Sequence, residues 1–183
     1  MSKTTFDSVI YAGIFLTEDS KELVKQSFGF GTRKDIDADI MWFGHHVTLY
    51  FKPTNYYLHL LHDHIGRTVD INPKRYIRDK NCSCVTVDTE LTRDLFMGRS
   101  MHLTICTWDT RGLAKEGKGI SPAYSNDLIL MDKFNDPNVI EAVNLGEAPE
   151  LKGKVGVFTS TLKEVTDPTI LLKGSIAEVG NLS

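Results

Sequence analysis

Two short segments of the chain repeat one pattern of alternating polar and apolar residues. The first is His46-Val47-Thr48-Leu49 and the second is His102-Leu103-Thr104-Ile105. Such an alternation is typical of a strand that buries one face, because successive side chains of a strand point to opposite sides. The pattern therefore predicts two strands. Each anchors in a core by its aliphatic residues and presents an imidazole and a hydroxyl on its other face.

The rest of the sequence predicts an α+β domain. Apolar runs predict strands over 9–16, 46–51, 82–87, 101–107, 155–161 and 169–179. Helices are expected over 17–28, ended by Gly29 and Gly31, and over 56–65. The glycine-rich segment 109–122 is expected to be an exposed loop. Strands with few short helices indicate the α+β class, and the absence of a linker predicts a single domain over 1–183.

Composition narrows the classes of function. The 183 residues carry a formal net charge of −3 and are 41% hydrophobic, as in an ordinary globular protein. Binding of long DNA or RNA usually requires a basic surface, so we expect a smaller nucleotide ligand instead. We expect no membrane segment, because no apolar run is long enough. The three cysteines include no Cys-x-x-Cys pair, which favours reduced thiols and a cytoplasmic location. Oligomeric state is left open.

The two His-x-Thr strands suit phosphodiester chemistry if they lie side by side. Two imidazoles can supply a general base and a general acid near neutral pH, because histidine titrates close to pH 6.5. Two threonine hydroxyls can donate hydrogen bonds to the non-bridging phosphate oxygens. The scheme requires no metal and no cofactor. The sequence does not assign the acid and the base between His46 and His102.

The repeat resembles the motifs of the two-histidine phosphoesterase superfamily, which includes cyclic phosphodiesterases of RNA repair and viral enzymes that destroy nucleotide signals. The likeness covers about 9–130, including the first strand and helix and the segment 121–127 after the second motif. It implies two lobes of antiparallel sheet around a central cleft, with helices outside. It also implies that His46, Thr48, His102 and Thr104 are the catalytic set. The two histidines are 56 residues apart, which is short for the family.

Aromatic residues near the motifs are candidates for stacking on a nucleobase. We expect Tyr11, Tyr124 and Trp42 to bind substrate, with Tyr11 and Tyr124 favoured because they lie in segments that resemble cleft-lining parts of the family. His45 is expected to face away from His46, since it precedes it on the same strand, and to be structural.

Other polar clusters do not predict a ligand site. The group His59, His62 and His64 is expected to be a solvated helix end rather than a metal site. The acidic run Asp35, Asp37 and Asp39 lacks the glycine and the glutamate of a calcium loop. We therefore predict no metal site.

The function predicted from these observations is a metal-independent phosphodiesterase acting on a nucleotide, a cyclic nucleotide or a short RNA-type oligonucleotide. Three alternatives stay open: hydrolysis of a 2',3'-cyclic phosphate in RNA repair, cleavage of cyclic or 2',5'-linked messengers by a viral or phage enzyme, and sequestration of a nucleotide without cleavage. A purely structural role has no positive feature in the sequence.

Overall fold

The computed structural model describes residues 4–28, 39–91, 95, 100–109, 111, 113 and 116–172. Its dominant element is a nine-stranded sheet in which every pairing is antiparallel. The strands are β2 (Val9–Leu16), β3 (Asp39–Trp42), β4 (His46–Phe51), β5 (Thr68–Arg78), β6 (Cys82–Thr89), β7 (His102–Asp109), β8 (Glu141–Asn144), β9 (Leu151–Thr159) and β10 (Lys163–Val165). The described helices are α1 (Glu18–Phe28), α2 (Asn55–His62) and α4 (Tyr124–Lys133), with short 3-10 turns at Phe6–Ser8 and Pro168–Ile170. The predicted α+β class is confirmed.

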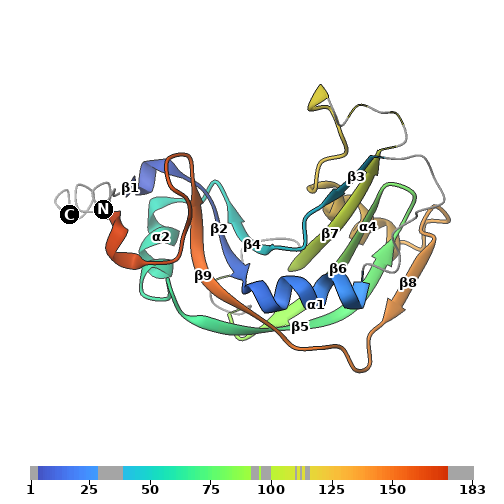
Figure 1. Ribbon diagram of the computed structural model, residues 1–183, viewed down its shortest axis with the longest axis horizontal. Helices are drawn as coiled ribbons and strands as arrows, with labels where there is room; N and C mark the ends of the chain where they lie inside the picture. Colours follow the sequence, from blue (N-terminus) through green and yellow to red (C-terminus); the bar gives the residue numbers. More distant parts are fainter. Residues whose placement is uncertain are drawn as a thin grey trace.

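The sheet closes on itself. Its order is β10-β9-β2-β4-β7-β6-β5-β8, with β3 on β7, and β9 also pairs with β5. Six strands, β9, β2, β4, β7, β6 and β5, therefore form a closed ring, and the helices lie outside the strands (Figure 1). A separate short pair joins β1 (Thr4–Thr5) to β11 (Leu171–Leu172) in parallel. Closure removes the edges of the six strands, which would otherwise expose unpaired backbone groups.

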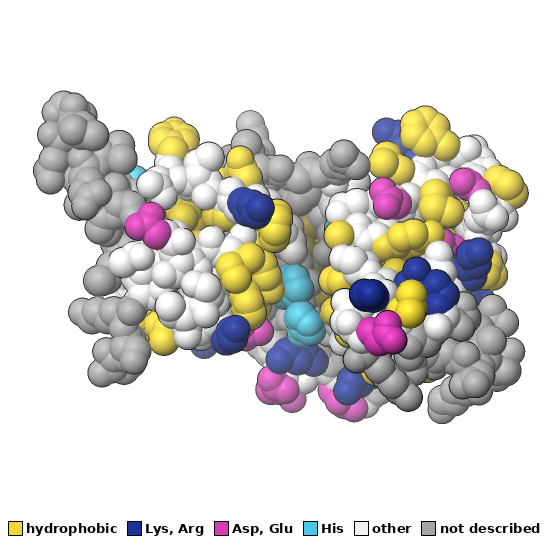
Figure 2. Space-filling model, turned by 90° about the horizontal axis from the view of Figure 1, so that it is seen from above, with side chains coloured by type: hydrophobic (Ala, Val, Ile, Leu, Met, Phe, Trp, Pro, Cys, Tyr) yellow, Lys and Arg dark blue, Asp and Glu magenta, His cyan; other side chains and the backbone are white. Residues whose placement is uncertain are grey.

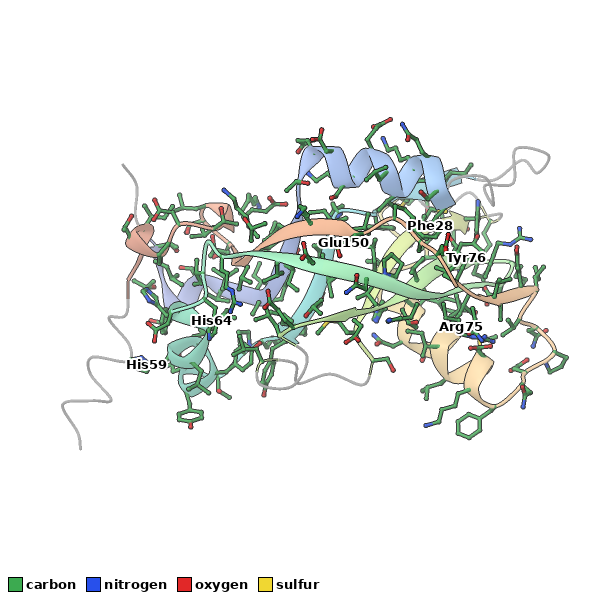
Figure 3. The ribbon with its side chains drawn as sticks, turned by 90° about the horizontal axis from the view of Figure 1, so that it is seen from below. Phe28, His59, His64, Arg75, Tyr76 and Glu150 are labelled. Carbon is green, nitrogen blue, oxygen red and sulfur yellow. The ribbon has the colours of Figure 1, made fainter. Side chains whose placement is uncertain are left out.

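Helix α1 is fixed at both ends. At its start, the backbone N–H of Ser20 donates to the Thr17 hydroxyl at 3.3 Å, which caps a free N–H of the first turn. The Ser20 hydroxyl in turn accepts the backbone N–H of Lys152 at 2.8 Å and ties the helix to β9. At its end, Phe28 stacks on Tyr76 of β5 with ring centroids 6.1 Å apart, and the two rings lie together under α1 in Figure 3. The described helix runs to Phe28, and the expected stop signals Gly29 and Gly31 lie outside the described residues.

Several predicted elements are confirmed with small shifts, and other elements were missed. The predicted strands at 9–16, 46–51, 82–87, 101–107 and 155–161 correspond to β2, β4, β6, β7 and β9, and the second predicted helix to α2. The structure adds the strands β1, β3, β5, β8 and β10 and the helix α4, which begins two residues after the segment 109–122 that was expected to be a loop. The predicted strand over 169–179 is wrong at 169–170, which belong to a 3-10 turn, and is confirmed at Leu171–Leu172, the short strand β11. Residues 173–179 lie outside the described part.

Proline explains why β5 was missed. Pro73 in the middle of a run argues against a central strand, because proline cannot donate to the ladder. On one side, β5 pairs with β9 from Thr68 to Ile71 and with β8 from Arg75 to Arg78. Pro73 lies in the gap between these two stretches. On the other side the pairing with β6 shifts register between Pro73 and Arg75. The missing N–H therefore falls where the ladder is interrupted.

The structure also describes the three cysteines and the character of the helices. Cys82, Cys84 and Cys106 are all free thiols and all buried. Within the described residues, none of the helices has the length and apolar character needed to cross a bilayer.

Candidate active site

The strands β4 and β7 carry the two His-x-Thr motifs, and they are neighbours in the sheet. The aliphatic residues anchor both strands: Val47, Leu49, Leu103 and Ile105 are each at most 1% exposed. The pairing is antiparallel, with Val47 opposite Leu103. Extending this register by one residue each way places His46 across from Thr104, and Thr48 across from His102. Each imidazole thus has a hydroxyl opposite it.

The two histidines occupy diagonal positions of this arrangement. Diagonal neighbours on an antiparallel pair are about 7–8 Å apart at the backbone. The sequence predicts this convergence only on the condition that the strands pair, and the closed sheet supplies that condition.

All four motif side chains line one pocket of about 790 Å³. The face in Figure 2 has histidine side chains in the hollow between its two halves. The other lining residues are Tyr11, Phe43, Leu49, Tyr50, Phe51, Ser100, Ser121, Pro122, Ala123, Asn126 and Asp127. Aromatic rings from β2 and β4 thus face polar groups from the start of α4, a mixture suited to a ligand with a flat ring and a polar head.

His102 is held by the main chain. Its Nδ1 lies 2.8 Å from the carbonyl oxygen of Ser100, which can only accept, so Nδ1 carries a proton and donates. The neutral ring then keeps its lone pair on Nε2, the nitrogen left for a ligand. Burial lowers the pKa of His102, while the bond to Ser100 opposes that effect.

His46 is packed between other rings. It stacks on Tyr11 with centroids 4.9 Å apart, and Tyr11 stacks on Phe158 at 5.2 Å. Burial, with the neighbouring His45 and His102, lowers the pKa of His46 to about 3. Burial also raises the pKa of Tyr11 to about 12, with the carboxylate of Glu164 adding to the effect. At neutral pH both His46 and Tyr11 are therefore uncharged.

The prediction for His45 was wrong in its geometry. We expected His45 to face away from His46, but its Nδ1 lies 2.6 Å from the Nδ1 of His46. Gly44 has a φ of 45°, so the chain turns there, and regular alternation begins only at His46. The backbone carbonyl of His45 accepts the N–H of Leu16 at 2.9 Å, which holds the turn against β2. The glycine before the motif was the only signal for this turn.

Thr104 is fixed by the segment that leads into α4. Its hydroxyl donates to the carbonyl of Pro122 at 3.2 Å and lies 2.8 Å from the hydroxyl of Ser125. Ser125 is fully buried and also contacts the thiol of Cys82 at 3.4 Å. Ser125 was not predicted, because nothing in the sequence links it to a strand 21 residues earlier.

Of the three aromatic residues expected to bind substrate, the structure brings only Tyr11 to the pocket. Tyr124 instead bonds the buried carboxylate of Asp79 at 2.5 Å and accepts from the Asn81 amide at 3.3 Å. Trp42 is 43% exposed on β3 and is not among the residues that line the pocket, whereas its neighbour Phe43 is. We therefore leave Tyr124 and Trp42 out of the site argued below.

No cluster of three or more His, Cys, Asp or Glu side chains suited to a metal ion occurs in the part of the chain that the structure describes. The run Asp35 to Asp39 falls almost wholly outside that part.

Comparison with known proteins identifies no family for this chain. No protein-family model and no curated protein matches the sequence. Among solved structures, a fungal RNA kinase is similar over 80% of this chain and 45% of its own, with a TM-score of 0.39 and 14% identity. This chain thus spans less than half the length of that protein, and a likeness of this strength carries no argument about activity.

Proposed function

We propose that this chain is a metal-independent phosphodiesterase that cleaves a phosphodiester bond in a nucleotide or short oligonucleotide. The observation that carries the proposal is that His46, Thr48, His102 and Thr104 line one pocket from two paired strands. In this proposal the pocket is the cleft between the two lobes that the family resemblance implies. Its walls come from β2 and β4 on one side and from β7 with the start of α4 on the other.

The surroundings of the two rings favour different roles. Burial lowers the pKa of both rings, but the carbonyl of Ser100 opposes this effect at His102, whereas His45 and His102 lower the pKa of His46 further. When an anionic phosphate binds between the rings and favours one imidazolium, the proton therefore resides on His102. We assign His102 as the general acid and His46 as the general base.

With a 2',3'-cyclic phosphate the step is a hydrolysis. Water attacks phosphorus and gives its proton to Nε2 of His46. The bond from phosphorus to one ribose oxygen breaks, and that oxygen takes the proton from Nε2 of His102. With a 2',5'- or 3',5'-linked substrate the neighbouring ribose hydroxyl replaces water as nucleophile, and the product carries a cyclic phosphate.

The threonines act on the charge that develops in the transition state. Hydroxyls aimed at the non-bridging oxygens stabilise the pentacoordinate phosphorus. To donate to phosphate, Thr104 must turn its proton away from the carbonyl of Pro122. Ser125 then remains as a donor to the Thr104 oxygen and keeps it in place.

The test is a substrate panel run with EDTA present. It contains 2',3'-cyclic mononucleotides, cyclic di- and trinucleotides and 2',5'-oligoadenylate, incubated with the wild type, His46→Ala and His102→Ala. We expect the wild type to turn over at least one substrate, and both variants to lose turnover while keeping the wild-type circular dichroism. Full activity in either variant contradicts the proposal, and stoichiometric binding without product favours sequestration instead.

A nucleotide p-nitrophenyl ester tests the assignment of roles, because p-nitrophenolate leaves without being protonated. Removal of the general acid should then change the rate of cleavage little, whereas removal of the general base should still lower it. We expect His102→Ala to recover much of the wild-type rate on this ester, and His46→Ala to remain inactive. The opposite pattern exchanges the two roles.

A further inference from the structure

The contact between His45 and His46 leaves room for only one proton. Two imidazole nitrogens 2.6 Å apart form a hydrogen bond only if one carries hydrogen and the other offers a lone pair. The contact therefore couples the protonation of the two rings. Whichever ring donates through Nδ1 keeps its lone pair on Nε2, and the ring that accepts carries its hydrogen on Nε2.

Only one of the two arrangements suits His46 as a base. If His45 donates, the neutral His46 carries hydrogen on Nε2, the nitrogen left for the pocket, and cannot accept a proton there. If His46 donates, its Nε2 offers a lone pair to the ligand. This second arrangement also survives the reaction, because the imidazolium formed by proton uptake at Nε2 still donates through Nδ1 to His45.

The groups around the pair keep His45 neutral at pH 7. Lys21 of α1 opposes a positive charge on His45, Glu164 of β10 favours one, and burial has the largest effect and lowers the pKa of His45. On the far side, His46 faces His102 of β7 and is stacked on Tyr11 of β2. Both rings are therefore neutral at pH 7, and the direction of the bond between them follows from the need of His46 for a lone pair on Nε2.

The geometry points to His45 as a positioning residue, which accepts the Nδ1–H of His46 and thereby holds its Nε2 lone pair toward the pocket. This inference rests on the proposed function, in which His46 is the base. His45 itself does not touch the reacting atoms. Its part resembles that of the group that orients a catalytic histidine in hydrolases, with a neutral ring in place of a carboxylate.

Nitrogen NMR of the protein labelled with ¹⁵N-histidine tests the proposal without substrate. The His46 signals are assigned by their loss in His46→Gln. At pH 7 we expect wild-type His46 to carry hydrogen on Nδ1, and His45 on Nε2. A wild-type His46 with hydrogen on Nε2 overturns the inference.

Two variants of matched size extend the test to the contact itself. His45→Asn places an amide oxygen near the position of Nδ1 and keeps an acceptor, whereas His45→Leu removes it. We expect the leucine variant to mix the two His46 tautomers and to lose kcat on the order of tenfold or more at nearly constant KM. The asparagine variant should keep the wild-type tautomer and recover most of kcat. An unchanged tautomer in His45→Leu overturns the inference.

The two proposals fail separately. If the wild type cleaves nothing in the panel, the proposed function fails, while the NMR measurement still decides the tautomer. If the panel gives turnover but His46 has the same tautomer and rate with leucine at position 45, the phosphodiesterase proposal stands and the role of His45 is refuted.

Discussion

The depressed pKa of His46 makes the stability of the fold depend on pH in a defined window. The pKa falls from 6.5 to about 3 because burial and two neighbouring histidines disfavour the imidazolium. Between these values the unfolded chain binds a proton that the folded chain does not. Protonation therefore pulls the equilibrium toward unfolding, so stability is complete above pH 6.5 and falls as pH drops toward 3. Replacing His46 by glutamine removes this dependence.

The magnitude follows from linkage. The full shift from 6.5 to about 3 corresponds to about 5 kcal/mol, at 1.36 kcal/mol for each pH unit. Between pH 7.5 and pH 5 only part of the window is crossed, and the loss from this group is about 2 kcal/mol. His45 and His102 also have pKa values lowered by burial, but both remain in the variant, so their contributions largely cancel in the comparison.

Urea unfolding measures the effect. The free energy of unfolding of the wild type and of His46→Gln is extrapolated to water at pH 7.5, 6.5, 5.5 and 5.0. We expect the wild type to lose about 2 kcal/mol more than the variant over this range. Parallel pH dependences, within the error of extrapolation, would mean that His46 takes up its proton freely in the folded protein. The argument from burial in the pocket would then be refuted.

Three further predictions concern other parts of the structure. Thr104→Ala should lower kcat on the order of 100-fold, because it removes one donor to the transition state. Ser125→Ala should lower kcat less, because Ser125 only holds the Thr104 hydroxyl in place. Steady-state kinetics on the best panel substrate tests this ranking, and equal losses of kcat in the two variants contradict it. Gly156→Ala should lower the free energy of unfolding in urea by roughly 1–3 kcal/mol, because a Cβ at this position would lie 2.3 Å from a backbone carbonyl oxygen of β10. Gly146→Ala is the control and should be nearly neutral, because a Cβ at position 146 would meet no atom within 4 Å. Tyr11→Leu should reduce kcat more than Tyr11→Phe, because the ring stacked on His46 is lost only in leucine; equal rates in both variants would show that the stacking is not used.

The local alternation of polar and apolar residues was sufficient to predict the two strands that carry the motifs. Alternation of side chains identified β4 and β7 and correctly assigned their buried faces, since Val47 and Leu103 are fully buried and their polar neighbours are not. That inference works because the period of a strand is a local property of the backbone. The same rule failed for His45, where a turn at Gly44 interrupts the strand geometry just before the motif.

What the sequence by itself determined is the kind of chemistry the chain carries: two imidazoles and two hydroxyls on the polar faces of two half-buried strands. Only the tertiary structure decided that these strands pair, in which register, and which distant groups complete the site. Ser125 contacts the Thr104 hydroxyl although the two residues are 21 positions apart in the sequence. Tyr124, which was expected to bind substrate, instead donates a hydrogen bond to Asp79, 45 positions away. Such contacts depend on how a closed sheet brings remote segments together. No local period of the sequence encodes that closure, because it is set by the summed burial of many strands at once.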